Sequence, residues 1–168
     1  ALLGAEVNKA MQHLSAKFGR NLSAWCEPGK YMVSKAGYFI TEVNVIKQTP
    51  TITFAGVNSG FNHLIRPMLY EAYHEIKNLS NPNGPLATYD VVGNICETDT
   101  FASDRQIAAI SEGDLLVFEN AGAYGFEMAS NFNSRYKPAE VMVVKGEAKL
   151  IRQRDTFEDL TRNQVEVL

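Results

Sequence analysis

The longest predicted strand lies in the stretch GYFITEVNVIKQ, residues 37–48. Its branched side chains, such as Ile40, Val43 and Val45, favour an extended backbone. Shorter runs of the same kind predict further strands at residues 51–57, 87–92, 114–119, 141–145 and 149–154. The last two are joined at Gly146 and predict a β-hairpin. Several strands at irregular spacing with few helices favour a mainly β-stranded, antiparallel barrel over a doubly wound sheet.

Helices are predicted at the two ends of the chain and once between the strands. Apolar residues recur at three- and four-residue steps over residues 3–18, which predicts a helix, and Gly19 ends it. A second helix is predicted over residues 64–76. Thr156 and Asp159 have the spacing of a capping box, so they predict a short helix in the tail.

The chain of 168 residues is 45% hydrophobic and 21% charged, with a formal net charge of −3. This composition is typical of one soluble globular domain. Since Lys and Arg form no cluster, the sequence argues against a nucleic-acid partner or an anionic membrane surface. No apolar stretch approaches the ~20 residues that a membrane helix needs. Cys26 and Cys96 are too few for a disulfide framework, so we expect a cytoplasmic protein whose partner is a small molecule or another protein.

Two glycine-containing segments could contact an anion. A predicted extended segment, residues 22–26, breaks at the turn EPGK, residues 27–30, where backbone amides could point outward. The loop over residues 56–62 follows a strand and could hold a phosphate or a substrate. In both cases an ordinary tight turn is the alternative.

Three polar groups could take part in chemistry. Arg66 and Tyr70 are four residues apart on the predicted helix, so both could hold one carboxylate. Cys96 and Glu97 share a loop, where a thiol next to an acid is a candidate for proton transfer. Tyr124 lies among small residues, which would let its ring approach a ligand closely. The alternatives are a surface ion pair, an inert cysteine and a packed tyrosine. The three histidines have no metal-ligand spacing, so no metal site is predicted.

Taken together, these segments resemble the C-terminal half of the diaminopimelate decarboxylases, and the resemblance covers essentially all of the chain. It is carried by EPGK at 27–30, GFNHLIRPMLY at 60–70, VGNICE at 92–97, GDLL at 113–116 and AGAYGFEMAS at 121–130. Shorter matches lie at residues 133–135, 138–140 and 152–160.

The resemblance implies a pyridoxal 5'-phosphate enzyme of the alanine racemase and ornithine decarboxylase type, in which a (β/α)8 barrel is followed by a Greek-key-like β-barrel. Residues 1–36 would be the end of the first barrel, residues 37–155 the second barrel, and residues 156–168 a tail helix. The implied activity is the decarboxylation of meso-diaminopimelate to L-lysine by a homodimer with shared active sites. The lysine that binds the cofactor covalently would lie in the missing first barrel, so we expect this chain alone to be inactive.

The same resemblance implies roles for the candidate residues. The cofactor would be bound by Glu27, Pro28, Gly29, Lys30 and Tyr124. The substrate would be bound by Lys30, Arg66, Tyr70, Glu97 and Tyr124. Cys96 would donate the proton to the carbanion that remains after carbon dioxide leaves, and Glu97 would bind the distal amine of the substrate. Both of these residues would reach into the partner's site.

Two positions depart from the family pattern. Position 30 is Lys where the family usually has Arg, which keeps the charge but loses the bidentate fork. Asn58 stands where the family commonly has Asp. Two alternatives remain: a related decarboxylase that acts on arginine, ornithine or carboxynorspermidine, and a non-catalytic dimerisation or binding module. Arg66 favours a substrate with a second carboxylate over a diamine-forming one.

Overall fold

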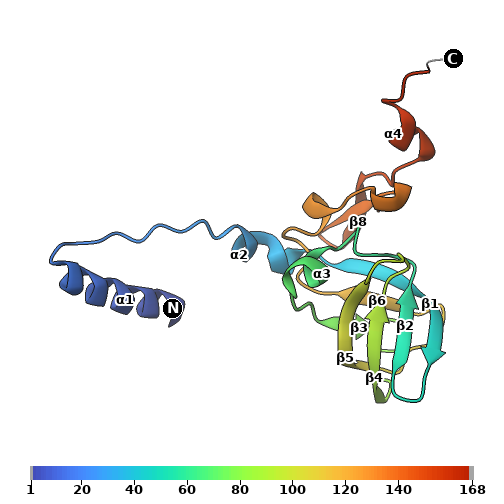
Figure 1. The fold of residues 1–168 in the computed structure, drawn as a ribbon, viewed down its shortest axis with the longest axis horizontal. Coiled ribbons are helices and arrows are strands. Elements are labelled where there is room, and N and C mark those ends of the chain that lie inside the picture. Colours follow the sequence, from blue (N-terminus) through green and yellow to red (C-terminus); the bar gives the residue numbers. More distant parts are fainter. Residues whose placement is uncertain (1, 167–168) are drawn as a thin grey trace.

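The computed structural model describes residues 2–166 and has a six-stranded sheet at its centre (Figure 1). Residue 1 and residues 167–168, which belong to the first and last predicted segments, lie outside the described residues. The strands of this sheet are β1 (Phe39–Gln48), β2 (Thr53–Val57), β3 (Ile76–Asn78), β4 (Leu86–Val92), β5 (Thr100–Ala108) and β6 (Leu115–Phe118). Their order across the sheet is β3-β6-β1-β2-β4-β5.

The sheet curls into a nearly closed barrel, which confirms the predicted mainly β-stranded, barrel-like fold. Its two edge strands approach each other, and the side-chain amide of Asn78 in β3 donates to the carbonyl of Ala109 just after β5, at 3.0 Å. The barrel is not wholly antiparallel, because β2 and β4 pair in parallel. Parallel pairing needs a long crossover connection. Residues 58–85 supply that connection and carry the next helix and β3.

The barrel interior is filled by apolar side chains from all six strands. Phe118 of β6 is fully buried and packs its ring 5.1 Å from that of Phe101 and 5.5 Å from that of Phe39. Val43 of β1 and Leu116 of β6 are also fully buried. Alternate residues of β1 point into the core from Phe39 to Val43. An irregularity in the pairing between Val43 and Val45 then shifts the pattern, so Val45 is exposed and Ile46 packs against the core.

Two strands and the end of one helix differ from the prediction. The strands β3 and β5 were not predicted; polar residues 103–106 conceal β5. The predicted helix over residues 64–76 is wrong beyond Tyr70, because only α3 (Arg66–Tyr70) is helical. Glu71 adopts a left-handed conformation with φ 53°, which ends the helix, and the buried Ile76 then pairs with Phe118 as part of β3.

A separate hairpin, β7 (Glu140–Val144) and β8 (Glu147–Arg152), lies beside the barrel and confirms the predicted turn at Gly146. Lys145 and Gly146 both have positive φ, as a two-residue turn of type I′ requires. The tail helix α4 (Phe157–Thr161) begins at Thr156 with the predicted capping box. Two 3₁₀ turns, η2 (Phe126–Met128) and η3 (Phe132–Ser134), precede the hairpin.

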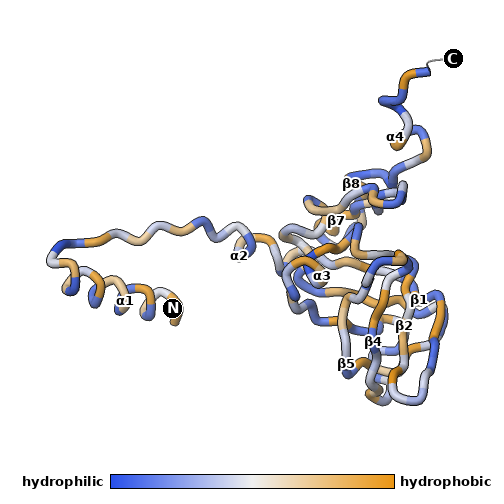
Figure 2. The backbone as a smooth tube through the Cα atoms, viewed as in Figure 1, coloured by the Kyte–Doolittle hydropathy of each residue, from blue (hydrophilic) through white to orange (hydrophobic). Residues whose placement is uncertain are grey.

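The first helix, α1 (Leu2–Phe18), also forms where predicted and ends at Gly19, whose φ is 64°. None of its residues is buried, and Figure 1 shows it apart from the barrel at the end of an extended segment. That segment, including residues 22–26, forms no strand. Apolar and polar residues alternate around α1 in Figure 2. Within residues 2–166, no helix combines the length and apolar character needed to cross a membrane.

The segment after the extended arm is held on the barrel by backbone contacts. It consists of α2 (Gly29–Val33) and the 3₁₀ turn η1 (Ser34–Ala36). The buried Ser34 hydroxyl donates to the carbonyl of Asn120 at 3.0 Å, and its carbonyl accepts from the amide of Gly122 at 3.0 Å. A Cβ atom on Gly122 would lie 2.1 Å from the carbonyl oxygen of Val33 and 2.7 Å from the amide of Gly37. The docking of α2 therefore requires glycine at position 122.

We expect Gly122→Ala to lower the free energy of unfolding by about 1–3 kcal/mol, because the two backbones must separate to admit the methyl group. Chemical denaturation followed by near-UV circular dichroism measures this change. Gly4→Ala is the matched control, since a Cβ atom there would contact nothing within 4 Å. Equal stability of the two variants would show that the backbone contact does not hold α2.

Candidate functional site

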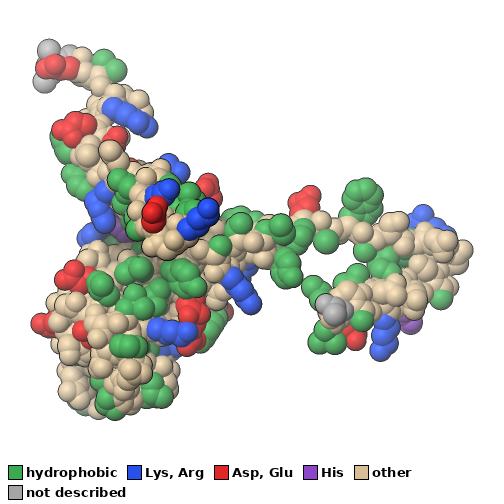
Figure 3. Space-filling model, turned by 180° about the vertical axis from the view of Figure 1, so that it is seen from behind, with side chains coloured by type: hydrophobic (Ala, Val, Ile, Leu, Met, Phe, Trp, Pro, Cys, Tyr) green, Lys and Arg blue, Asp and Glu red, His purple; other side chains and the backbone are tan. Residues whose placement is uncertain are grey.

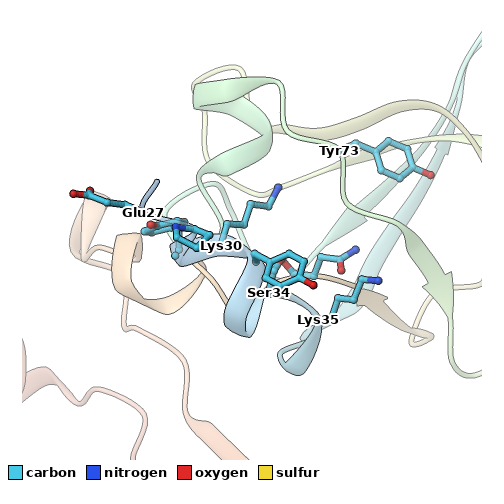
Figure 4. Close-up of a pocket in the computed structure, with 10 residues that line it drawn as sticks. Glu27, Lys30, Ser34, Lys35 and Tyr73 are labelled. Atoms are coloured by element: carbon cyan, nitrogen blue, oxygen red, sulfur yellow. The ribbon is translucent and has the colours of Figure 1, made fainter. Parts of the chain in front are cut away.

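The docked α2 and the loop that carries Tyr124 line an open cavity of about 820 Å³. Two lysines, three tyrosines and one glutamate are among the residues that line it: Glu27, Pro28, Gly29, Lys30, Tyr31, Ser34, Lys35, Tyr73, Asn120 and Tyr124. Figure 4 shows Lys30 and Lys35 extending from the blue segment that contains α2 and η1, and Tyr73 extending from the green segment that follows α3, whereas the Glu27 carboxylate points away from them. The volume is in the range of small-molecule sites, and the two lysines favour an anionic ligand.

Arg66, at the start of α3, lies between two tyrosine rings. Its guanidinium carbon is 5.6 Å from the centre of the Tyr70 ring and 5.8 Å from that of Tyr124. These three residues and Met128 line a second, smaller cavity of about 300 Å³. The Nε atom of Arg66 is buried and has no hydrogen-bond partner in the structure. A buried donor without a partner is costly, so this group is suited to an incoming acceptor such as a carboxylate.

Tyr124 lines both cavities, and its hydroxyl lies next to the turn at residues 27–30. A Cβ atom on Gly29 would lie 2.8 Å from the Tyr124 hydroxyl. Tyr124 has φ 59°, an unusual conformation for a residue with a side chain, and the residue remains 45% exposed. The glycine therefore leaves room for a phenol hydroxyl that can still reach a ligand.

The turn at residues 27–30 offers fewer free amides than the sequence predicts. The Gly29 amide donates to the Glu27 carbonyl at 2.8 Å, and the Tyr31 amide donates to the Pro28 carbonyl at 3.1 Å. These two bonds would have to open before those amides could bind an anion. Lys30 and Lys35 are therefore the main cationic groups on this side of the cavity.

His74 is a residue near this site that the sequence did not reveal. Its Nδ1 atom donates to the Glu119 carbonyl at 2.8 Å, since a carbonyl only accepts. Burial lowers the pKa of His74 below its usual value, and the nearby Arg66 and Lys30 lower it further. The neutral ring leaves Nε2 as a buried acceptor with no partner in the structure. His74 has no metal-ligand spacing to another residue, so no sequence pattern pointed to it.

Cys96 and Glu97 form a second group, away from the two cavities. The Cys96 thiol donates to the Glu97 carboxylate at 3.5 Å, and both residues are exposed. Neither lines the cavities described above. The structure thus brings Arg66, Tyr70 and Tyr124 together and places the predicted proton donor elsewhere on the chain.

The Cys96 loop is organised by Asp99, a second residue that the sequence did not identify. Its carboxylate accepts from the amides of Phe61 at 2.8 Å and Ile95 at 3.1 Å. Asp99 is 6% exposed, and burial raises the pKa of its carboxyl group, while the two amide bonds partly offset that effect. In the sequence, only the position of Asp99 three residues after Cys96 could have drawn attention to it, and that spacing alone does not indicate a function.

In the loop over residues 56–62, several polar groups bond within the protein. This agrees with an ordinary tight turn, the alternative to a loop that holds a phosphate or a substrate. The Ser59 hydroxyl pairs with His63 Nδ1 at 2.8 Å, and Asn62 is fully buried. Asn58 accepts from the Thr41 hydroxyl at 2.6 Å through its Oδ1 atom. That oxygen also accepts from the Glu42 amide, so Asn58 has an acceptor role that an aspartate could equally fill.

Charged side chains of both signs are interspersed over the barrel and hairpin on the face shown in Figure 3, without a continuous basic area. The fold and the site together define a β-barrel domain with arginine, lysine and tyrosine side chains gathered around two neighbouring cavities. The family described as pyridoxal-dependent decarboxylase, C-terminal sheet domain, matches residues 30–122. The chain belongs to this family.

Relatives support the same assignment. The chain is 47% identical over 152 residues to a diaminopimelate decarboxylase of Methanothermobacter thermautotrophicus, and 46% identical over 147 residues to that of Campylobacter jejuni. These matches cover 89% and 87% of this chain but only 35% and 36% of the relatives. The chain therefore spans about a third of the length of the curated relatives it matches.

Solved structures agree with the fold. The diaminopimelate decarboxylase from M. jannaschii in complex with L-lysine gives a TM-score of 0.80 at 34% identity, over 92% of this chain and 36% of that one. The Helicobacter pylori enzyme complexed with L-lysine gives 0.74 at 37% identity, over 89% of this chain and 37% of that one. A lysine/ornithine decarboxylase from Vibrio vulnificus, at 20% identity and a TM-score of 0.57 over 64% of this chain and 30% of that one, shares the fold.

We expect Gly29→Ala to displace the Tyr124 ring, because the new methyl group would overlap the phenol oxygen. In NMR spectra the ring signals of Tyr124 should shift, while those of the distant Tyr89 in the barrel core stay unchanged. Gly4→Ala is again the matched control and should move neither ring. Unchanged Tyr124 signals in the Gly29→Ala variant would contradict the close contact.

Proposed function

We propose that this chain is the C-terminal part of a diaminopimelate decarboxylase, a carbon–carbon lyase that converts meso-diaminopimelate to L-lysine with pyridoxal 5'-phosphate. The observation that carries the proposal is the cluster of Arg66, Tyr70 and Tyr124 next to the docked turn at residues 27–30. The named relatives share this region of the chain at close to half identity.

The residues present fit an anionic cofactor. Lys30 and Lys35 supply positive charge to the larger cavity, and the Tyr124 hydroxyl lies at Gly29, where no side chain blocks it. Pyridoxal phosphate supplies the electron sink for decarboxylation when it is bound. This chain would contribute Glu27, Pro28, Gly29, Lys30 and Tyr124 to the place where the cofactor is held. The lysine at position 30 would contact it as a point charge.

Arg66 and Tyr70 would hold the distal carboxylate of the substrate. The buried Arg66 Nε atom lacks a partner, and a carboxylate supplies acceptors for the guanidinium fork. This requirement separates diaminopimelate, which has two carboxylates, from arginine and ornithine, which have one. A substrate whose distal end is only an amine or a guanidinium would place positive charge against Arg66. Arg66 therefore favours diaminopimelate, whose distal end carries a carboxylate.

Cys96 and Glu97 would act in the site of a second copy of the chain. Both are exposed, and neither lines the cavities of its own chain. In such a homodimer the Cys96 thiol would donate the proton to the substrate carbon after carbon dioxide leaves. Glu97 would bind the distal amine, because its carboxylate is exposed and carries the opposite charge.

We further propose that residues 1–36 are the end of the cofactor-binding barrel, that residues 37–155 form the second barrel, and that residues 156–168 are the segment of the tail helix. The apolar residues of α1 support this division. Leu2, Leu3 and Phe18 are 81%, 74% and 60% exposed, so they are available to pack against further protein.

In a full-length enzyme, we expect Cys96→Ala to lower kcat by about 100-fold or more, the usual contribution of a positioned general acid. Pyridoxal phosphate affinity should stay unchanged, because Cys96 is not among the residues proposed to hold the cofactor. Cys26→Ala, which removes the other exposed free thiol, is the matched control and should keep full turnover. Turnover that survives Cys96→Ala would disprove the proton-donor role.

A further inference from the structure

We propose that Asp99 is a positioning residue that fixes the Cys96–Glu97 loop and couples it to the segment leading into Arg66. The functional importance of this loop rests on the proposed function. The structural coupling does not, since it follows from contacts within the chain.

Asp99 closes the loop at three points. One carboxylate oxygen accepts from the Phe61 amide at 2.8 Å, and the other accepts from the Ile95 amide at 3.1 Å. The Asp99 backbone carbonyl accepts from the Gly93 amide at 2.7 Å. Because Ile95 directly precedes Cys96, the bond to its amide fixes the backbone from which the thiol projects.

The space around the carboxylate is tightly limited. A Cβ atom on Gly93 would lie 2.0 Å from an Asp99 carboxylate oxygen. One on Gly60 would lie 2.7 Å from the same oxygen and 2.5 Å from the end of the Ile95 side chain. Two glycines therefore surround the group, and a carboxylate one methylene longer would not fit.

Further bonds connect the loop to its surroundings. The Asn94 amide donates to the Ser59 carbonyl at 2.9 Å, and Arg135 donates to the Asn94 carbonyl at 3.2 Å. Phe61, which Asp99 holds by its amide, is buried at the start of the segment that reaches Arg66 five residues later. Movement of the Cys96 loop would therefore disturb the segment that carries the substrate clamp.

Asp99 acts through these neighbours, since it lines neither cavity. Its task requires two acceptor oxygens, because both of its partners are amide donors. Asparagine has the same shape but only one acceptor oxygen, and its amide nitrogen would face a second donor. Asp99→Asn is thus a conservative change that breaks one of the two bonds.

The rate of alkylation of Cys96 by iodoacetamide, resolved by mass spectrometry, tests the proposal on the chain itself. We expect Asp99→Asn to raise the Cys96 rate by about fivefold, the factor that corresponds to one lost hydrogen bond, because the thiol is released from Glu97. Cys26, the other exposed thiol, is an internal reference and should keep its rate. An unchanged Cys96 rate would overturn the proposal.

Asp90→Asn is the matched control for a merely structural effect. Asp90, in β4, also accepts from a backbone amide, that of Asp104 in β5 at 2.8 Å, but this bond lies outside the Cys96 loop. This variant should leave both alkylation rates unchanged. If it raised the Cys96 rate as much as Asp99→Asn does, the effect would be general loosening of the fold and the proposal would be wrong.

Amide hydrogen exchange in the unsubstituted chain gives a second test that does not depend on a variant folding. The Phe61 and Ile95 amides should exchange much more slowly than that of the exposed Glu97, because they donate to a buried carboxylate. Exchange at Ile95 as fast as at Glu97 would overturn the proposal. Neither test measures decarboxylation, so the role of Asp99 and the proposed function can fail separately.

Discussion

The arrangement of the site depends on a direct contact between two stretches of backbone. Gly37 and Gly122 lie so close that neither position has room for a Cβ atom. The Ser34 hydroxyl and the Ala121 amide add hydrogen bonds across the same contact. This contact attaches α2 to the barrel and thereby brings Gly29 next to the Tyr124 hydroxyl. The cavity with its two lysines therefore depends on this backbone packing as much as on its own side chains.

Buried polar groups organise the two halves of the site in different ways. At Asp99 each carboxylate oxygen has an amide partner, so the group stabilises a fixed loop. At Arg66 and His74 a buried nitrogen has no partner within the structure. Unpaired groups of this kind cost stability unless a ligand or ordered water satisfies them. Asp99, whose hydrogen bonds are satisfied, thus fixes the loop of the proposed proton donor, whereas Arg66, which has an unpaired nitrogen, belongs to the proposed substrate clamp.

Much of the fold could be predicted because its signals are local. Branched residues predicted β1, β2, β4 and β6, and the glycine turn predicted the β7–β8 hairpin. The missed β5 contains a polar stretch whose alternation is broken at Asp104, where φ is 52°. The helix beyond Tyr70 was wrong because a left-handed Glu71 and pairing of β3 with β6 override local preference. The contacts of Asp99 and His74 join residues 38 and 45 positions apart, which no local pattern reveals.

In the proposed homodimer, one chain supplies Arg66 to a site and a second chain supplies Cys96. Mixing two full-length variants, Cys96→Ala and Arg66→Met, tests it most directly. Each variant alone should be nearly inactive toward meso-diaminopimelate. In a mixed dimer, one site would receive an intact Arg66 from the first chain and an intact Cys96 from the second, so activity should return on mixing. Failure of activity to return, with mixed dimers shown to form, would contradict the shared site.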